Sequence, residues 1–203
     1  MKPLSITLSA LALLCAASTA QAAIINYQTT LTGAAEFPVN DSPGTGTVHL
    51  AYDNVAHSYK IKVIFSGLLG NTTAAHIHCC TAIPFAGTAG VATRTPSFLG
   101  FPAGVTAGVY EAEVDMTQPG SFNAAFVAAN GGTFGGAEAA LFGAMDTGRT
   151  YFNLHSSRFP GGEIRGFLVQ VPEPASMALF GLGAAALLMA QRRRRASSAR
   201  AHA

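Results

Sequence analysis

Hydrophobic and polar residues alternate along several short segments of the chain, which is the pattern of β-strands that bury one face. In residues 45–52, Val48, Leu50 and Tyr52 share one face of such a strand. Residues 57–65 alternate in the same way after an Asp-Asn turn signal. Two consecutive strands of this kind predict a β-hairpin that is apolar on one side and polar on the other.

Further segments with strand character lie between turns rich in glycine, proline and serine. Residues 84–102 are rich in Gly, Thr and Pro and predict a long irregular loop, and residues 135–145 are the one candidate for a short helix. This succession predicts an all-β domain, an antiparallel β-sandwich or barrel with one short helix. The remaining strands are expected over residues 24–31, 73–78, 108–116, 149–155 and 164–171.

The N-terminus has the three parts of a secretory signal peptide. It has a basic start at residues 1–2, an apolar run at residues 4–17 and a small-x-small cleavage site at residues 20–22. We therefore expect residues 1–22 to be removed during export. The alternative, a first transmembrane helix, is disfavoured because the apolar run is short and the cleavage site is well placed.

The C-terminal residues 171–203 form a tail that also has three parts. We expect its apolar run, residues 175–190, to enter the inner membrane as a transmembrane helix, with the following arginines on the cytoplasmic side. Such a helix measures about 24 Å against a hydrocarbon core of roughly 30 Å, which suits temporary retention better than permanent residence. The polar parts of the tail are the motif Val171-Pro172-Glu173-Pro174 and the cluster Arg192, Arg193, Arg194 and Arg195.

This tail resembles the PEP-CTERM sorting signal of Gram-negative bacteria, which exosortases recognise at the Pro-Glu-Pro motif. The resemblance implies export through the general secretion machinery, transient insertion into the inner membrane and processing by an exosortase. It also implies a final location at the cell surface or outside the cell. Exopolysaccharide or another surface matrix is the partner expected there.

Removing both ends changes the charge of the protein. The whole chain has a formal net charge of +2, but residues 23–170 contain six basic and nine acidic residues, a formal charge of −3. The basic charge therefore belongs to the sorting tail, and nothing in the exported domain supports a nucleic-acid partner. The length of this segment is that of one domain with a full hydrophobic core.

The exported domain contains two adjacent cysteines, Cys79 and Cys80, because Cys15 leaves with the signal peptide. An oxidising compartment favours a bridge, although a bridge between neighbours closes a tight and strained ring. The sequence leaves three alternatives open: a vicinal disulfide, an intermolecular bridge, or two free thiols near a metal.

Three histidines are the residues with the clearest potential for chemistry. His76 and His78 are separated by one residue in a predicted strand, so their side chains project to the same side. Two such imidazoles can bind one transition metal, copper or zinc, if the sheet curves or a loop adds a ligand. His155, at the end of another strand, is the natural third ligand. The alternatives are three hydrogen-bonded structural histidines, or a general base, for which no nucleophile motif is present.

Two segments of the chain resemble the signatures of the CHRD domain, the module named after chordin. The first is Gly67-Leu68 with Ala-Ala-His-Ile-His at residues 74–78, and the second is Tyr-Phe-Asn-Leu-His at residues 151–155 with Phe-Pro-Gly-Gly-Glu-Ile-Arg-Gly at residues 159–166. The resemblance runs from about Thr30 to Val169, nearly the whole of the predicted domain at residues 23–170. CHRD domains joined to PEP-CTERM tails are a familiar combination in bacteria. Cys79-Cys80 departs from the glycine-rich loop that commonly follows the first signature.

The second signature contains further structural or ligand candidates. Glu163 and Arg165 alternate along a predicted strand, so an ion pair between them, or bonds to loop backbone, would fix the preceding turn. Anion binding by Arg165 is the alternative. Gly161 and Gly162 are expected to supply positive-φ turn geometry, and Asn153 to satisfy backbone groups at a strand end.

These observations leave competing functions. The first is an exported surface or matrix protein with a non-enzymatic binding or structural role. The second is a metal-binding, redox-type protein that uses His76, His78 and His155. The third, an enzyme acting on extracellular polysaccharide, lacks the pair of acids in a groove that glycoside hydrolysis requires.

Overall fold

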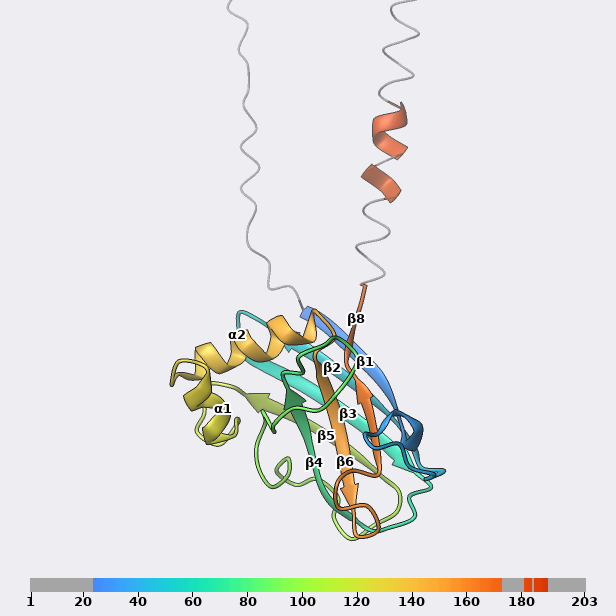
Figure 1. Cartoon of the computed structure of the whole chain (residues 1–203). Coiled ribbons are helices and arrows are strands. Elements are labelled where there is room, and N and C mark those ends of the chain that lie inside the picture. The colour runs from blue at the N-terminus through green and yellow to red at the C-terminus, as the bar shows by residue number, and fades with distance from the viewer. Residues whose placement is uncertain (1–23, 173–180, 184, 190–203) are drawn as a thin grey trace, which may run out of the picture.

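The described strands form one antiparallel sheet (Figure 1). Burial alternates along strands such as Thr45–Asp53 and Ser58–Ser66, so the sheet has an apolar inner face. The structure is a computed structural model and describes residues 24–172, 181–183 and 185–189. Its strands follow the order β4-β6-β7-β1-β2-β3-β5, with β8 beside β1. The strands are β1 (Ile24–Thr32), β2 (Thr45–Asp53), β3 (Ser58–Ser66), β4 (Thr72–Cys79), β5 (Gly108–Asp115), β6 (Thr150–Ser156), β7 (Ile164–Phe167) and β8 (Val169–Val171).

The predicted hairpin is confirmed as β2 and β3. Val48 pairs with Val63 and Leu50 with Ile61, and all four side chains are buried in the core. The prediction of an all-β antiparallel fold is likewise confirmed. The architecture is a single sheet curled into a half-barrel rather than a sandwich of two separate sheets.

Within residues 24–172, two α-helices rather than one pack beside the sheet, which corrects the prediction of one short helix. Helix α2 (Phe134–Met145) matches the predicted segment, and α1 (Ala124–Ala129) precedes it. The shorter helix begins where the Asn123 side chain accepts a hydrogen bond from the Ala125 N–H. Six residues are too few to show a hydrophobic period, so the sequence pattern did not reveal it. A short 3-10 helix, η1 (Gly33–Ala35), follows β1.

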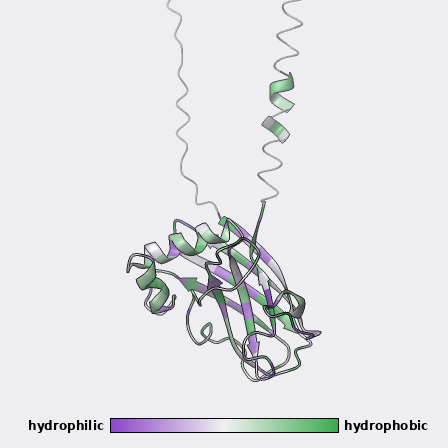
Figure 2. Cartoon of the chain, viewed as in Figure 1, coloured by the Kyte–Doolittle hydropathy of each residue, from purple (hydrophilic) through white to green (hydrophobic). Residues whose placement is uncertain are grey.

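Helix α2 covers the inner face of β1, β2 and β3. The Phe142 ring stacks on Tyr52 at a centroid distance of 3.6 Å, and the Tyr52 hydroxyl donates to Glu138 at 2.7 Å. The Tyr27 hydroxyl similarly donates to Asp146. Figure 2 shows this largely hydrophobic helix above strands that alternate between hydrophilic and hydrophobic residues. The helix therefore packs its buried side into the hydrophobic core of the sheet.

The strand predicted over residues 164–171 is interrupted. β7 pairs with β6, whereas β8 pairs with β1 from Asn26 to Gln28. Between them Leu168 is fully buried, and its N–H bonds to the Thr150 carbonyl. The chain thus changes its strand partner at Leu168. Residues 84–102 form the predicted irregular loop, with isolated bridges only.

Most of the two sorting segments lies outside the described residues. These include the predicted signal peptide 1–22, Glu173, Pro174 and the arginine cluster 192–195. Within the predicted membrane helix, residues 181–183 and 185–189 are described and are helical. Among the residues that the structure describes, no helix reaches the length and apolarity needed to span a membrane. The transmembrane helix stays a prediction.

Candidate metal centre

Strands β4 and β6 bring the three predicted histidines to one face of the sheet. In their antiparallel register, His78 lies opposite Tyr151, His76 opposite Asn153, and Ala74 opposite His155. Residues directly opposite one another point to the same side. The other face of the same strands contributes Ile77 and other apolar side chains to the core.

The ligand nitrogens of His76, His78 and His155 all lie within 4.8 Å of one another. The Nε2 atoms of His76 and His155 are 3.0 Å apart. For comparison, two imidazole nitrogens bound to one tetrahedral zinc at about 2.0–2.1 Å are separated by about 3.3 Å. The spacing of His76 and His155 is therefore close to that of two ligands of one metal ion, and the ligand nitrogen of His78 lies within 4.8 Å of both.

Hydrogen bonds determine which nitrogen of each imidazole carries the proton. The Nδ1 atoms of His76, His78 and His155 lie 3.1, 2.8 and 2.8 Å from backbone carbonyl oxygens of Pro96, Ala89 and Pro160 respectively. A carbonyl oxygen only accepts, so each Nδ1 must donate. Each neutral imidazole then presents its Nε2 lone pair to the cluster. Backbone carbonyls orient metal-binding histidines in the same way in other proteins.

This arrangement leaves the Nε2 lone pairs unsatisfied in the absence of a cation. Those of His76 and His155 face each other, and the buried Nε2 of His78 has no hydrogen-bond partner. Burial lowers the pKa of His76 and of His78 to about 4, and lowers the pKa of His155 as well. Protonation therefore does not relieve the repulsion at neutral pH. One metal ion would satisfy all three nitrogens together.

The metal-free domain is expected to lose stability as the pH falls from about 6.5 to 4. The pKa of His76 and of His78 is 6.5 in the ordinary state and about 4 in the fold, so the unfolded chain binds more protons in this window. This pH-dependent part of the unfolding free energy is greatest above pH 6.5 and falls by on the order of 3 kcal/mol for each imidazole as the pH falls toward 4. This fall compares one protein at two pH values and does not set its stability relative to a variant at pH 7. Urea unfolding at a series of pH values measures it.

A His76→Gln, His78→Gln variant provides the control for this pH dependence. Burial raises the pKa of Glu36 to about 7, which acts in the opposite direction but equally in both proteins. The difference in unfolding free energy between wild type and variant should therefore change across the window. A constant difference from pH 6.5 to 4 would contradict the assignment of neutral, buried imidazoles.

Arg165 pairs with Glu36 and not with Glu163, which corrects the predicted ion pair. Its Nε lies 3.9 Å from the Glu36 carboxylate and donates to the Ala35 carbonyl. Glu163 precedes β7 and accepts instead from the N–H groups of Leu69 and Gly70, as well as from the Ser42 hydroxyl. The other expectation, that Glu163 forms hydrogen bonds with loop backbone, agrees with the structure.

Of the remaining candidates of the second signature, Gly162 agrees with the prediction, whereas Gly161 and Asn153 differ from it. Gly162 has a φ of 132°, but Gly161 has an ordinary φ and open space around it, which corrects the prediction for Gly161. Asn153 lies within β6 rather than at its end, and its side chain lies beside Gly162. A β-carbon at Gly162 would also meet the Glu36 carboxylate. The lack of a side chain at Gly162 thus allows the side chains of Asn153 and Glu36 to lie close to its backbone.

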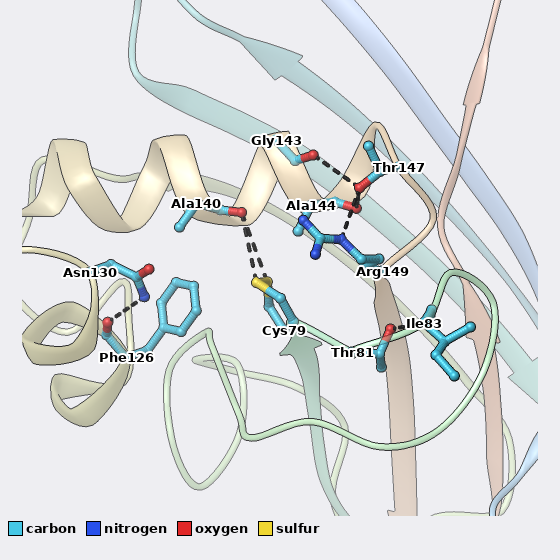
Figure 3. The surroundings of a disulfide bond; sticks show 11 residues. Cys79, Thr81, Ile83, Phe126, Asn130, Ala140, Gly143, Ala144, Thr147 and Arg149 are labelled. Carbon is cyan, nitrogen blue, oxygen red and sulfur yellow. Dashed lines mark hydrogen bonds between the residues drawn. A yellow bond between two sulfur atoms is a disulfide. The ribbon is translucent and has the colours of Figure 1, made fainter.

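Cys79 and Cys80 form a disulfide with each other beneath helix α2 (Figure 3). Their sulfur atoms lie 3.9 and 3.8 Å from the Ala140 carbonyl oxygen. Since side chains alternate along β4, the buried Cys79 points away from the face of His76 and His78. A cysteine thiolate is therefore not a ligand of the three-histidine cluster in this arrangement.

Two buried residues of the site were not predicted from the sequence. The Tyr151 ring stacks on the His78 ring with centroids 4.7 Å apart, and Glu36 forms an ion pair with Arg165. Tyr151 shares the alternation of Asn153 and His155, so the period of the strand could have identified it. Glu36 follows η1 in an irregular segment, and no pattern in the sequence relates it to β7.

Comparison with known protein families agrees with both resemblances seen in the sequence. The CHRD domain family matches residues 27–168, and the PEP-CTERM protein-sorting motif matches residues 170–195. No curated protein and no solved structure shows significant similarity to the chain. The family match includes all three histidines, both cysteines and the Glu36–Arg165 pair. The chain therefore belongs to the CHRD domain family and bears a PEP-CTERM sorting motif at its C-terminus.

Proposed function

We propose that this exported CHRD domain is a non-enzymatic metal-binding module that holds one copper or zinc ion on His76, His78 and His155. One observation supports this above all. Each of the three imidazoles places a ligand nitrogen within 4.8 Å of the other two, while every Nδ1 is bonded to a backbone carbonyl, which leaves Nε2 as the ligand atom. Structural histidines would be expected to use both ring nitrogens in hydrogen bonds.

The donor set favours copper or zinc over hard cations. Imidazole nitrogen suits zinc and copper, whereas calcium and magnesium require oxygen ligands. Three protein ligands would leave a further coordination position for water or a small molecule. A redox role would require copper, because zinc has no accessible redox chemistry.

The surroundings of Glu111 and Glu113 support a non-enzymatic role over polysaccharide hydrolysis. Both acids project from the outer face of β5 and are exposed. Glu111 pairs with Lys62 at 2.5 Å, and Glu113 lies 3.9 Å from Lys60. Both carboxylates are solvated and paired with lysines, unlike the general acid of glycoside hydrolysis, which lies in an apolar pocket.

The PEP-CTERM motif makes this an exported protein of Gram-negative type that an exosortase processes. We further propose that the tail retains the chain transiently in the inner membrane before the domain reaches the cell surface or the extracellular matrix. Exopolysaccharide is the matrix component proposed as its partner there. The metal-binding domain would then act outside the cell.

Metal titration of the exported protein tests the proposal. After removal of metal with a chelator, calorimetric titration with Cu²⁺ or Zn²⁺ should show one tight site per chain. A His49→Gln variant is the matched control, because His49 is exposed on the outer face of β2 and should not affect binding. Absence of a stoichiometric site for either metal would exclude the proposed function. A loss of metal affinity in His49→Gln as large as that in His76→Gln would exclude it as well.

A further inference from the structure

His78 is held differently from the other two imidazoles. The Nε2 atoms of His76 and His155 contact each other, whereas that of His78 has no hydrogen-bond partner. The His78 ring is parallel to the Tyr151 ring within 5°, and its Nδ1 donates to the Ala89 carbonyl at 2.8 Å. The direction of the His78 lone pair therefore depends on Tyr151 and on the loop around Ala89.

Tyr151 also binds this loop directly. Its hydroxyl oxygen lies 3.3 Å from the Ala89 nitrogen, from which it accepts, and 3.4 Å from the Ala89 carbonyl oxygen, to which it donates. The carbonyl that orients His78 is therefore positioned by the same tyrosine that stacks on the His78 ring. Tyr151 is 2 % exposed, so both contacts are shielded from water.

Arg165 supports Tyr151 and the loop from the next strand. Because β6 lies between β4 and β7, the Tyr151 ring has His78 on its β4 side and Arg165 on its β7 side. The Arg165 guanidinium carbon is 4.7 Å from the centre of the Tyr151 ring, a cation–π contact. Its terminal nitrogen donates to the Gly87 carbonyl at 3.1 Å, two residues before Ala89.

We infer that Tyr151 and Arg165 are positioning residues that orient His78 for metal binding. Arg165 holds the tyrosine ring and the Gly87 carbonyl, and Tyr151 holds the Ala89 carbonyl and the imidazole. The inference rests on the proposed function, since it concerns how that site is built. Groups that orient metal ligands typically change metal affinity by about 10- to 100-fold when they are removed.

An Arg165→Lys variant tests this role. Lysine keeps the charge but lacks the planar fork that bonds two carbonyls while stacking on a ring. We expect Zn²⁺ or Cu²⁺ to bind with one equivalent per chain but about 10- to 100-fold more weakly. The electron paramagnetic resonance spectrum of the Cu²⁺ form should also change. Arg158→Lys, at an exposed arginine between β6 and β7, is the matched control and should bind as wild type does.

A double-mutant comparison separates positioning from general stability. In a His78→Gln background, Arg165→Lys should cause no further loss of affinity, because the ligand that it orients is already gone. The same fold loss in both backgrounds would overturn the inference. If Arg165→Lys fails to fold, Tyr151→Phe keeps the ring and removes the hydroxyl. Its affinity loss should likewise disappear in the His78→Gln background.

The two proposals fail in distinguishable ways. A wild-type protein that binds neither metal would refute the proposed function itself. If the wild type binds metal, and both Arg165→Lys and Tyr151→Phe bind it with the same affinity as the wild type, only the positioning role is refuted. Reduced affinity with an unchanged Cu²⁺ spectrum in the variants would also overturn it, since reorientation of His78 must alter the ligand field.

Discussion

Replacing any one of His76, His78 or His155 with glutamine is expected to weaken Zn²⁺ or Cu²⁺ binding by about a hundredfold or more. The reason is that each imidazole supplies one of three ligand nitrogens that lie within 4.8 Å of one another, and even indirect perturbation of such ligands costs about 10- to 100-fold. Isothermal titration with each metal measures the loss. His49→Gln, an exposed histidine of β2, serves as the control and should retain full affinity.

The stability of the metal-free variants distinguishes metal ligands from structural histidines. His76→Gln removes one of two lone pairs that face each other at 3.0 Å, so the metal-free protein should be as stable as wild type or more stable at pH 7. A purely structural role predicts the opposite, a loss of unfolding free energy without any metal effect. Lost stability together with unchanged metal binding would contradict the site.

Gly166→Ala is expected to destabilise the domain by about 3 kcal/mol or more. Gly166 has an ordinary backbone conformation, but an added β-carbon would collide with the Thr30 carbonyl and the Thr29 hydroxyl of β1. Because one of these atoms belongs to the backbone of a paired strand, β1 and β7 would have to separate. Urea unfolding of wild type and variant at pH 7 gives the difference.

Gly161→Ala is the matched control from the same sequence signature. No atom lies within 4 Å of the β-carbon that alanine would add, and Gly161 does not have a positive φ. Its unfolding free energy should stay within about 0.5 kcal/mol of wild type. Equal destabilisation by the two substitutions would show that collision of a β-carbon at Gly166 with β1 is not the cause of the lost stability.

Local sequence patterns predicted the features that depend on short stretches of chain. The β2–β3 hairpin follows from alternation on both sides of one turn, and His76 and His78 share a face because they are two residues apart. Helix α1 escaped prediction because its six residues are too short for a period to appear. The break at Leu168 depends on a change of strand partner, which no local pattern records.

The chemistry of the site depends on contacts between distant segments, and these were only partly predictable. The sequence suggested His155 as a third ligand, but its approach to His76 depends on the register of β4 against β6. Glu36 reaches Arg165 from an irregular segment 129 positions earlier in the chain. The carbonyls that orient the imidazoles belong to loops, where backbone direction cannot be inferred from residue type.

X-ray absorption at the copper or zinc edge is the most direct test of the central claim, that three imidazoles bind one metal ion. For the metal-loaded exported protein, the account predicts a first shell that includes three imidazole nitrogens at about 2.0–2.1 Å and contains no sulfur. The His76→Gln variant should show fewer imidazole nitrogens. A sulfur ligand at about 2.3 Å, or a shell of oxygen atoms only, would contradict the three-histidine site.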